Sequence, residues 1–205
     1  MENMAQGINK SPAFIIDRDG VINRMVNYSG QWDSPQKPKD VRLVDGIVDI
    51  LHWLNERHIP IIEISNQPGI AKGKMTQETS DAIENRVHQL LASRGVRIDK
   101  TYICPHHPKG VVPELTRECD CRKPKAGLFI KAAKDLGINF SESVMLGDKA
   151  SDIQAGDAVG CKTVLYLHNE DQPEKIEQTK RARADHQVTR VQEVLEILPK
   201  IFKLV

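Results

Sequence analysis

The chain has few aromatic residues, no excess of charge of one sign and no long apolar run. Aromatic residues make up 4% of the sequence, and 29 Lys and Arg against 28 Asp and Glu leave a formal net charge of +1. A near-neutral chain offers no general attraction to nucleic acid or an anionic membrane. Residues 1–11 also lack the basic and then apolar layout of a signal peptide. We therefore expect a cytoplasmic protein with neither of these partners.

Cysteine is scarce as well, with four residues in 205, which is too few for a disulfide-built domain of this length. In a reducing compartment these cysteines are expected to be thiols or metal ligands. The length suits one domain, residues 1–205, and no internal repeat is present. We expect that domain to be a monomer.

Apolar patterns along the chain alternate between strand and helix. Short apolar runs predict strands at residues 13–16, 60–65, 100–103, 143–146 and 162–167. Helical spacing predicts helices at residues 47–54, 77–93, 127–136, 151–158 and 191–202, with Gly137 ending the third. Residues 168–185 are charged and are interpreted as a solvated connection or a short helix. Such alternation is typical of an α/β fold with a doubly wound parallel sheet, which is Rossmann-like.

The first strand leads directly into Asp17-Arg18-Asp19-Gly20. Ligands of open α/β sheets bind at the carboxyl ends of strands, and Gly20 permits a sharp turn there. Two adjacent carboxylates repel each other unless a cation or a proton transfer uses them. By itself this pattern fits an ordinary Asp/Gly turn about as well as a catalytic site.

Residues 24–44 form an irregular stretch that is too long for an ordinary connection. It carries Tyr28 and Trp32 and could fold over the strand ends as a specificity loop. A disordered segment or an edge hairpin is an equally good interpretation.

Residues 104–124 are predicted to be a metal loop. Three cysteines and two adjacent histidines, His106 and His107, lie within it, and prolines prevent regular structure. Zinc prefers four thiolate or imidazole ligands, and a site filled by protein ligands is structural. We assign zinc to Cys104, His106, Cys119 and Cys121, with His107 as the alternative to His106. Cys161 is expected to be a small buried apolar residue.

Further polar groups follow the other predicted strands. Arg122 and Lys123 come directly after the last zinc ligand, Ser65-Asn66-Gln67 follows the second strand, and Gly147-Asp148-Lys149 follows the fourth. Carboxylates, a hydroxyl, an amide and cations form a set suited to phosphoryl transfer. Asp17-Arg18-Asp19-Gly20, Ser65-Asn66-Gln67, Lys123 and Gly147-Asp148-Lys149 resemble the four motifs of the haloacid dehalogenase superfamily. Together with Cys-Pro-His-His and Cys-Asp-Cys-Arg-Lys-Pro they are similar to its zinc-containing branch without a large cap domain.

The resemblance implies a role for each matching position. Asp17 would be the nucleophile that forms an aspartyl-phosphate, and Asp19 the general acid and base. Mg²⁺ would be held by Asp17, by the backbone carbonyl of Asp19 and by Asp148. The remaining roles would be phosphoryl binding by Ser65 and Lys123, substrate binding by Asn66, Gln67 and Arg122, and orientation of the acids by Lys149. Asp152 fits a support of the metal site and a helix-start carboxylate equally well.

The implied activity is hydrolysis of a small phosphorylated substrate by a phosphatase that uses Mg²⁺ and carries Zn²⁺. Enzymes of this branch act on heptose bisphosphates or on histidinol phosphate, and the long segment between Cys104 and Cys121 is more similar to the heptose enzymes. Histidinol phosphate or another small sugar phosphate is the alternative. A zinc module that binds or processes nucleic acid ends would need a basic face, and none is evident.

Overall fold

The computed structural model describes residues 10–167 and 182–204, and its centre is a six-stranded parallel sheet. The strand order is β5-β4-β1-β6-β7-β8, which places β1 between β4 and β6. The strands are β1 (Phe14–Ile16), β4 (Ile61–Asn66), β5 (Lys100–Cys104), β6 (Val144–Gly147), β7 (Lys162–Tyr166) and β8 (His186–Val188). The predicted α/β class and parallel sheet are confirmed.

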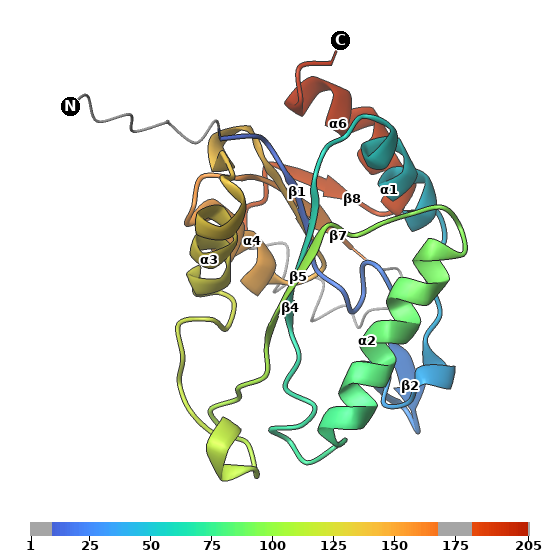
Figure 1. Cartoon of the computed structure of the whole chain (residues 1–205), viewed down its shortest axis with the longest axis vertical. Helices are drawn as coiled ribbons and strands as arrows, with labels where there is room; N and C mark the ends of the chain where they lie inside the picture. The colour runs from blue at the N-terminus through green and yellow to red at the C-terminus, as the bar shows by residue number, and fades with distance from the viewer. Residues whose placement is uncertain (1–9, 168–181, 205) are drawn as a thin grey trace, which may run out of the picture.

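Helices cover both faces of this sheet (Figure 1). Helices α1 (Ile47–Glu56), α2 (Gln77–Ala92) and α6 (Val194–Ile201) lie on one face, and α3 (Gly127–Leu136) and α4 (Ala150–Asp157) lie on the other. Helix α1 shows why the sequence folds this way, because Ile47, Ile50, Leu51 and Leu54 fall on one side and all are fully buried. Each such side chain contributes about 1.5–3 kcal/mol through burial.

The five helices and five strands expected from the sequence are present, with two differences. The last helix begins with a 3-10 turn at Val191–Glu193 before α6, and the edge strand β8 was not predicted. Residues 168–181 of the predicted charged connection lie outside the described residues. Gly137 adopts a φ of 67° and ends α3 as predicted.

The 24–44 stretch is folded rather than irregular. Strands β2 (Val26–Tyr28) and β3 (Gln31–Asp33) pair as an antiparallel hairpin. The Tyr28 hydroxyl donates to Asp40 at 2.9 Å, and Asp33 pairs with Lys74 in the segment that follows β4. The hairpin interpretation is confirmed, and the Asp33–Lys74 pair connects the hairpin to the segment that follows β4. No helix within the described residues is long and apolar enough to span a membrane.

Candidate active site

The loop after β1 holds its two acids at the carboxyl edge of the sheet, next to the ends of β4 and β6. The Asp17 amide donates to the Leu146 carbonyl on β6 at 3.1 Å. Gly20 adopts a φ of 97°, in the left-handed region that favours glycine, and turns the chain back so that the amides of Ile22 and Asn23 reach the Arg18 carbonyl. Asp17 and Asp19 are both buried, at 4% and 3% exposure.

Lys123 reaches into the same place from the loop before α3. Its ammonium is 2.9 Å from Asp17 Oδ1 and 2.6 Å from Asp152 Oδ1, and it donates to the Ile64 carbonyl at 2.5 Å. Burial opposes its charge, but the two carboxylates outweigh burial and raise the pKa of Lys123. A permanently charged group therefore lies beside Asp17, where an anionic phosphoryl group would need neutralisation.

Asp152 plays a larger part than the sequence indicated. Its carboxylate accepts from the Lys149 amide at 3.0 Å, which caps the start of α4, and it also pairs with Lys123. The helix-start role weighed for Asp152 is thus confirmed, and support of the metal site stays a prediction. One oxygen from each of Asp17, Asp148 and Asp152 lies within 4.8 Å of the others, which is an arrangement that could hold a metal ion.

Lys149 lies against the three groups that the resemblance assigns to Mg²⁺. Its ammonium is 3.2 Å from the Asp19 carbonyl, 3.2 Å from Asp148 Oδ1 and 3.9 Å from Asp17 Oδ2. Oxygen ligands of this kind suit Mg²⁺, which is commonly held by one or two carboxylates plus substrate phosphate and water. The Lys149 ammonium thus lies where these three groups converge, and their binding of Mg²⁺ stays a prediction.

Three of the predicted substrate-binding residues have partners inside the protein. The Asn66 side chain donates to the Lys123 carbonyl and accepts from the Lys123 amide, both at 3.0 Å. Gln67 donates to Asp19 Oδ2 at 2.6 Å and to Ser65 Oγ at 2.8 Å. Arg122 donates to the His106 carbonyl at 3.1 Å. These contacts position the site's own groups, while substrate contact by the three residues stays a prediction.

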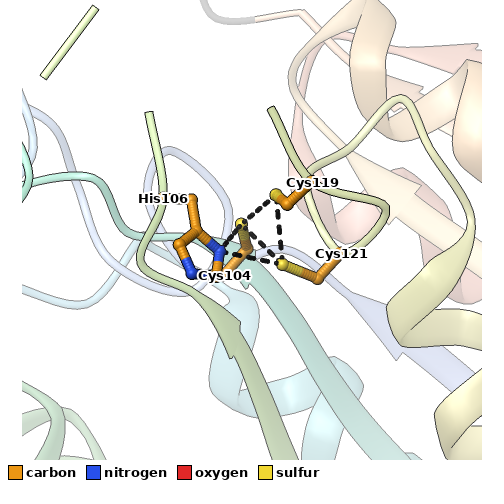
Figure 2. Close-up of side chains that lie close together, drawn as sticks. All are labelled: Cys104, His106, Cys119 and Cys121. Carbon is orange, nitrogen blue, oxygen red and sulfur yellow. Dashed lines mark hydrogen bonds between the residues drawn. The ribbon is translucent and has the colours of Figure 1, made fainter. Parts of the chain in front are cut away.

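The predicted zinc ligands converge in one cluster on the loop after β5 (Figure 2). Cys121 Sγ lies 3.2 Å from the sulfurs of Cys104 and Cys119 and 3.2 Å from His106 Nδ1. Cys104 Sγ is 3.6 Å from Cys119 Sγ and 3.8 Å from His106 Nδ1. Thiolate ligands of a tetrahedral zinc ion lie about 3.8 Å apart, so the donor set fits zinc and the atoms lie somewhat closer together than they would around the ion.

The neighbouring histidine is turned away from this cluster. His107 Nδ1 accepts from the Lys109 amide at 3.1 Å, in a turn of the loop. His106 faces the sulfurs with Nδ1, and its Nε2 lies 2.6 Å from the Arg117 guanidinium. The geometry therefore favours His106 over His107 as the fourth ligand.

A further group of charged residues next to the site was missed from the sequence. Arg18, Glu63, Glu84 and His88 lie together between β4 and α2, and Glu63 is completely buried. One signal was available, because Glu63 interrupts an otherwise apolar strand pattern at residues 61–64.

This group predicts a pH dependence of stability. The carboxylates of Glu63 and Glu84 raise the pKa of His88 to about 10, and burial raises the pKa of Glu63 to about 7. A raised pKa in the folded state gives stability that is present below the ordinary value, 6.5 for His88, and is lost as the pH rises towards 10. His88→Gln should flatten the fall of the melting temperature between pH 6.5 and 10. His52→Gln, which removes an exposed imidazole on α1, should not, and parallel curves for wild type and His88→Gln would contradict the assignment.

The sequence of this chain is similar to those of known proteins. The family model described as HAD-hydrolase-like matches residues 120–194. The D-glycero-beta-D-manno-heptose-1,7-bisphosphate 7-phosphatase of Escherichia coli O6:H1 is 37% identical over 165 residues, which cover 80% of this chain and 84% of that enzyme. This chain belongs to the haloacid dehalogenase-like phosphatases. The enzyme of the same name from Yersinia pestis is 38% identical over 156 residues, or 76% of this chain and 80% of that one.

Solved structures share the fold. A structure from Mesorhizobium loti described as a HAD-like phosphatase superposes with a TM-score of 0.78 at 29% identity, covering 95% of this chain and 88% of that one. The D,D-heptose 1,7-bisphosphate phosphatase from B. bronchiseptica, solved with magnesium and phosphate, superposes with a TM-score of 0.75 at 24% identity. That match covers 93% of this chain and 99% of the other, so the fold extends over nearly the whole chain.

Proposed function

We propose that this phosphatase removes the 7-phosphate of D-glycero-beta-D-manno-heptose 1,7-bisphosphate with the help of Mg²⁺. The observation that carries the proposal is the position of Asp17, with Lys123 at 2.9 Å and the Asp148 and Asp152 carboxylates beside it. The sugar is supported by the names of the relatives that match over four fifths of their length.

Each residue has a place in this reaction. An Asp17 oxygen attacks phosphorus, the bond from phosphorus to the sugar oxygen breaks, and a proton from Asp19 goes to that oxygen. Water then attacks the phosphorus of the aspartyl-phosphate, Asp19 takes a proton from that water, the bond from phosphorus to the Asp17 oxygen breaks, and inorganic phosphate leaves. Asp17, the Asp19 carbonyl and Asp148 would hold Mg²⁺, which would supply charge neutralisation between the anionic nucleophile and the anionic phosphate. Ser65 and Lys123 hold the phosphoryl oxygens.

Cations of the segment after β4 and of the zinc loop lie near one another, and they are proposed to receive the second phosphate of a doubly phosphorylated substrate. Burial and the charges of Lys72 and Arg122 lower the pKa of His107. Burial and the charge of Lys74 lower the pKa of Lys72. These cations come from the segment after β4 and from the zinc loop, so a second phosphate there would gain from them. Arg122 and the 24–44 hairpin are proposed to select the substrate at this place.

Zinc at Cys104, His106, Cys119 and Cys121 is proposed to be structural, because all four tetrahedral positions are filled by protein atoms. The single-domain organisation, the monomeric state, the cytoplasmic location and the absence of a nucleic-acid partner remain predictions.

Phosphate release from a panel of compounds with Mg²⁺ tests the substrate. The panel holds both anomers of the heptose bisphosphate, the heptose 1-phosphate, histidinol phosphate, hexose phosphates and a 3′-phosphorylated oligonucleotide. The proposal predicts the highest kcat/KM for the beta bisphosphate and retention of its 1-phosphate. Preference for histidinol phosphate or the oligonucleotide would contradict it.

A further inference from the structure

The carboxylate of Asp19 is held from four sides by donors of the protein. Arg18 donates from Nε to Oδ1 and from Nη2 to Oδ2, both at 3.2 Å. Asn23 donates to Oδ1 at 3.0 Å, and Gln67 donates to Oδ2 at 2.6 Å. Both oxygens are thus engaged, so the direction of this carboxylate is set by its surroundings rather than by its own rotamer preference.

Arg18 is the donor in this set that contacts helix α2. Its third nitrogen, Nη1, donates to Glu84 Oε2 on α2 at 2.6 Å, and Nη2 also donates to Gln67 Oε1 at 2.6 Å. The Arg18 side chain is 3% exposed. The planar guanidinium donates hydrogen bonds from all three of its nitrogens. It therefore fixes Asp19 relative to α2, which the flexible ammonium of a lysine cannot do.

Glu84, which anchors Arg18, is held in turn by its own partners. Glu84 Oε1 lies 2.9 Å from His88 Nε2, and the same histidine nitrogen lies 3.7 Å from Glu63 Oε2 and 3.3 Å from Thr101 Oγ1. Burying so many charged groups costs stability unless they are paired, and a core of apolar residues would avoid that cost. Oxygen and nitrogen atoms of Glu63, Glu84 and His88 are close enough to hold a cation. However, Arg18 and His88 already pair with the two glutamates, so the cluster is better explained as an anchor.

We propose that Arg18, anchored by Glu84 on α2, is a positioning residue that sets where the Asp19 carboxylate meets the leaving oxygen of the substrate. The inference rests on the proposed role of Asp19 as the acid of a phosphatase. Arg18 touches no reacting atom, and its effect passes through Asp19. The network connects Asp19 to helix α2, which covers one face of the sheet. The general acid is therefore oriented by residues that do not themselves contact phosphate.

The leaving group distinguishes positioning of the acid from a merely structural role. A sugar alkoxide needs a proton to leave, whereas p-nitrophenolate leaves without one. Arg18→Lys keeps the positive charge but removes the two N–H donors that contact the Asp19 oxygens together. Glu84→Gln removes the negative charge that anchors Arg18. In both variants the rate of the first step, measured in a single turnover as transfer of the phosphoryl group to Asp17, should fall about 10- to 100-fold for the alkyl phosphate that the wild type turns over fastest. With p-nitrophenyl phosphate the first step is followed as the burst of p-nitrophenolate, which precedes hydrolysis of the aspartyl-phosphate. Its rate should change by less than about threefold, and the half-saturating concentration should stay near wild type for both substrates.

Comparing the two activities of each variant separates an effect on Asp19 from a loss of folded protein. The ratio of the two activities is measured on one protein preparation, so partial unfolding lowers both and cancels. In the first step Asp19→Asn should show the same selective loss, and adding Arg18→Lys to it should cause no further loss with the alkyl phosphate. Arg86→Lys on the exposed side of α2 is the control and should behave as wild type.

Two results would overturn the inference. Equal losses with both substrates in Arg18→Lys, or losses that multiply in the double variant, would show that Arg18 does not act through Asp19. Either leaves the proposed function intact, because the wild type still hydrolyses the alkyl phosphate. A wild type that hydrolyses neither compound with Mg²⁺ would overturn both the proposed function and this inference.

Discussion

Asp17→Asn removes turnover almost completely, by about 10⁴-fold or more in kcat, because an amide oxygen is a poor nucleophile toward phosphorus. The substitution is nearly isosteric, so its effect on the fold should be small. The Lys123 ammonium that lies 2.9 Å from Asp17 keeps a carboxylate partner in Asp152. The amide oxygen of asparagine can also still accept from it. The loss is measured as phosphate release, with the melting temperature recorded on the same sample.

Two further variants separate the nucleophile from general charge effects. Asp45→Asn removes an exposed acid that pairs with Arg24 at 2.5 Å, and it should leave kcat unchanged. Asp148→Asn should instead raise the Mg²⁺ concentration needed for half-maximal activity, since it removes a proposed ligand and not the nucleophile. Asp17→Asn that keeps more than about a tenth of wild-type kcat would exclude nucleophilic catalysis by Asp17.

Cys119→Ser is expected to release the zinc ion and to reduce the order of the loop that carries Arg122 and Lys123. A hydroxyl replaces one of three sulfurs that lie 3.2–3.6 Å from one another, and it is a poor zinc ligand. The loop holds little regular structure besides one short 3-10 turn, so its order depends on the metal. Zinc content should fall from one ion to none per chain, and kcat/KM should fall about tenfold or more.

The fourth cysteine supplies a matched control. Cys161 is buried outside the cluster, so Cys161→Ser changes the same atom type without touching the metal loop. Its zinc content should stay at one, measured by elemental analysis, and cleavage within residues 105–118 during limited proteolysis should stay slow. Cys119→Ser that retains zinc, or that loses zinc without faster cleavage of the loop, would contradict a structural zinc site.

The candidate site was largely predictable because parallel strands bring their carboxyl ends together. Asp17 and Asp148 directly follow β1 and β6, and Ser65 lies at the carboxyl end of β4, which with β1 and β6 forms the centre of the sheet. The cysteine cluster was predictable for a different reason, since few arrangements besides a metal site use three cysteines and a histidine in one short loop.

Other features depend on contacts that no local pattern reveals. Strand β8 has only three residues, His186-Gln187-Val188, and is recruited by pairing with β7 rather than by its own periodicity. Gln67 sits in a motif that suggests substrate contact, yet its amide joins Asp19, Ser65 and Arg18. Which donors an amide selects is decided by distances across the fold, and these exist only once the sheet has formed.

Trapping of the covalent intermediate tests the central claim most directly. Asp19→Asn should slow hydrolysis of the aspartyl-phosphate, because the second step needs a base to take a proton from water. Acid quenching this variant during turnover of p-nitrophenyl phosphate with Mg²⁺, whose leaving group needs no proton from residue 19, and mapping its peptides by mass should place one phosphoryl group on Asp17. Phosphate on another residue, or none at any time while product forms, would contradict the mechanism.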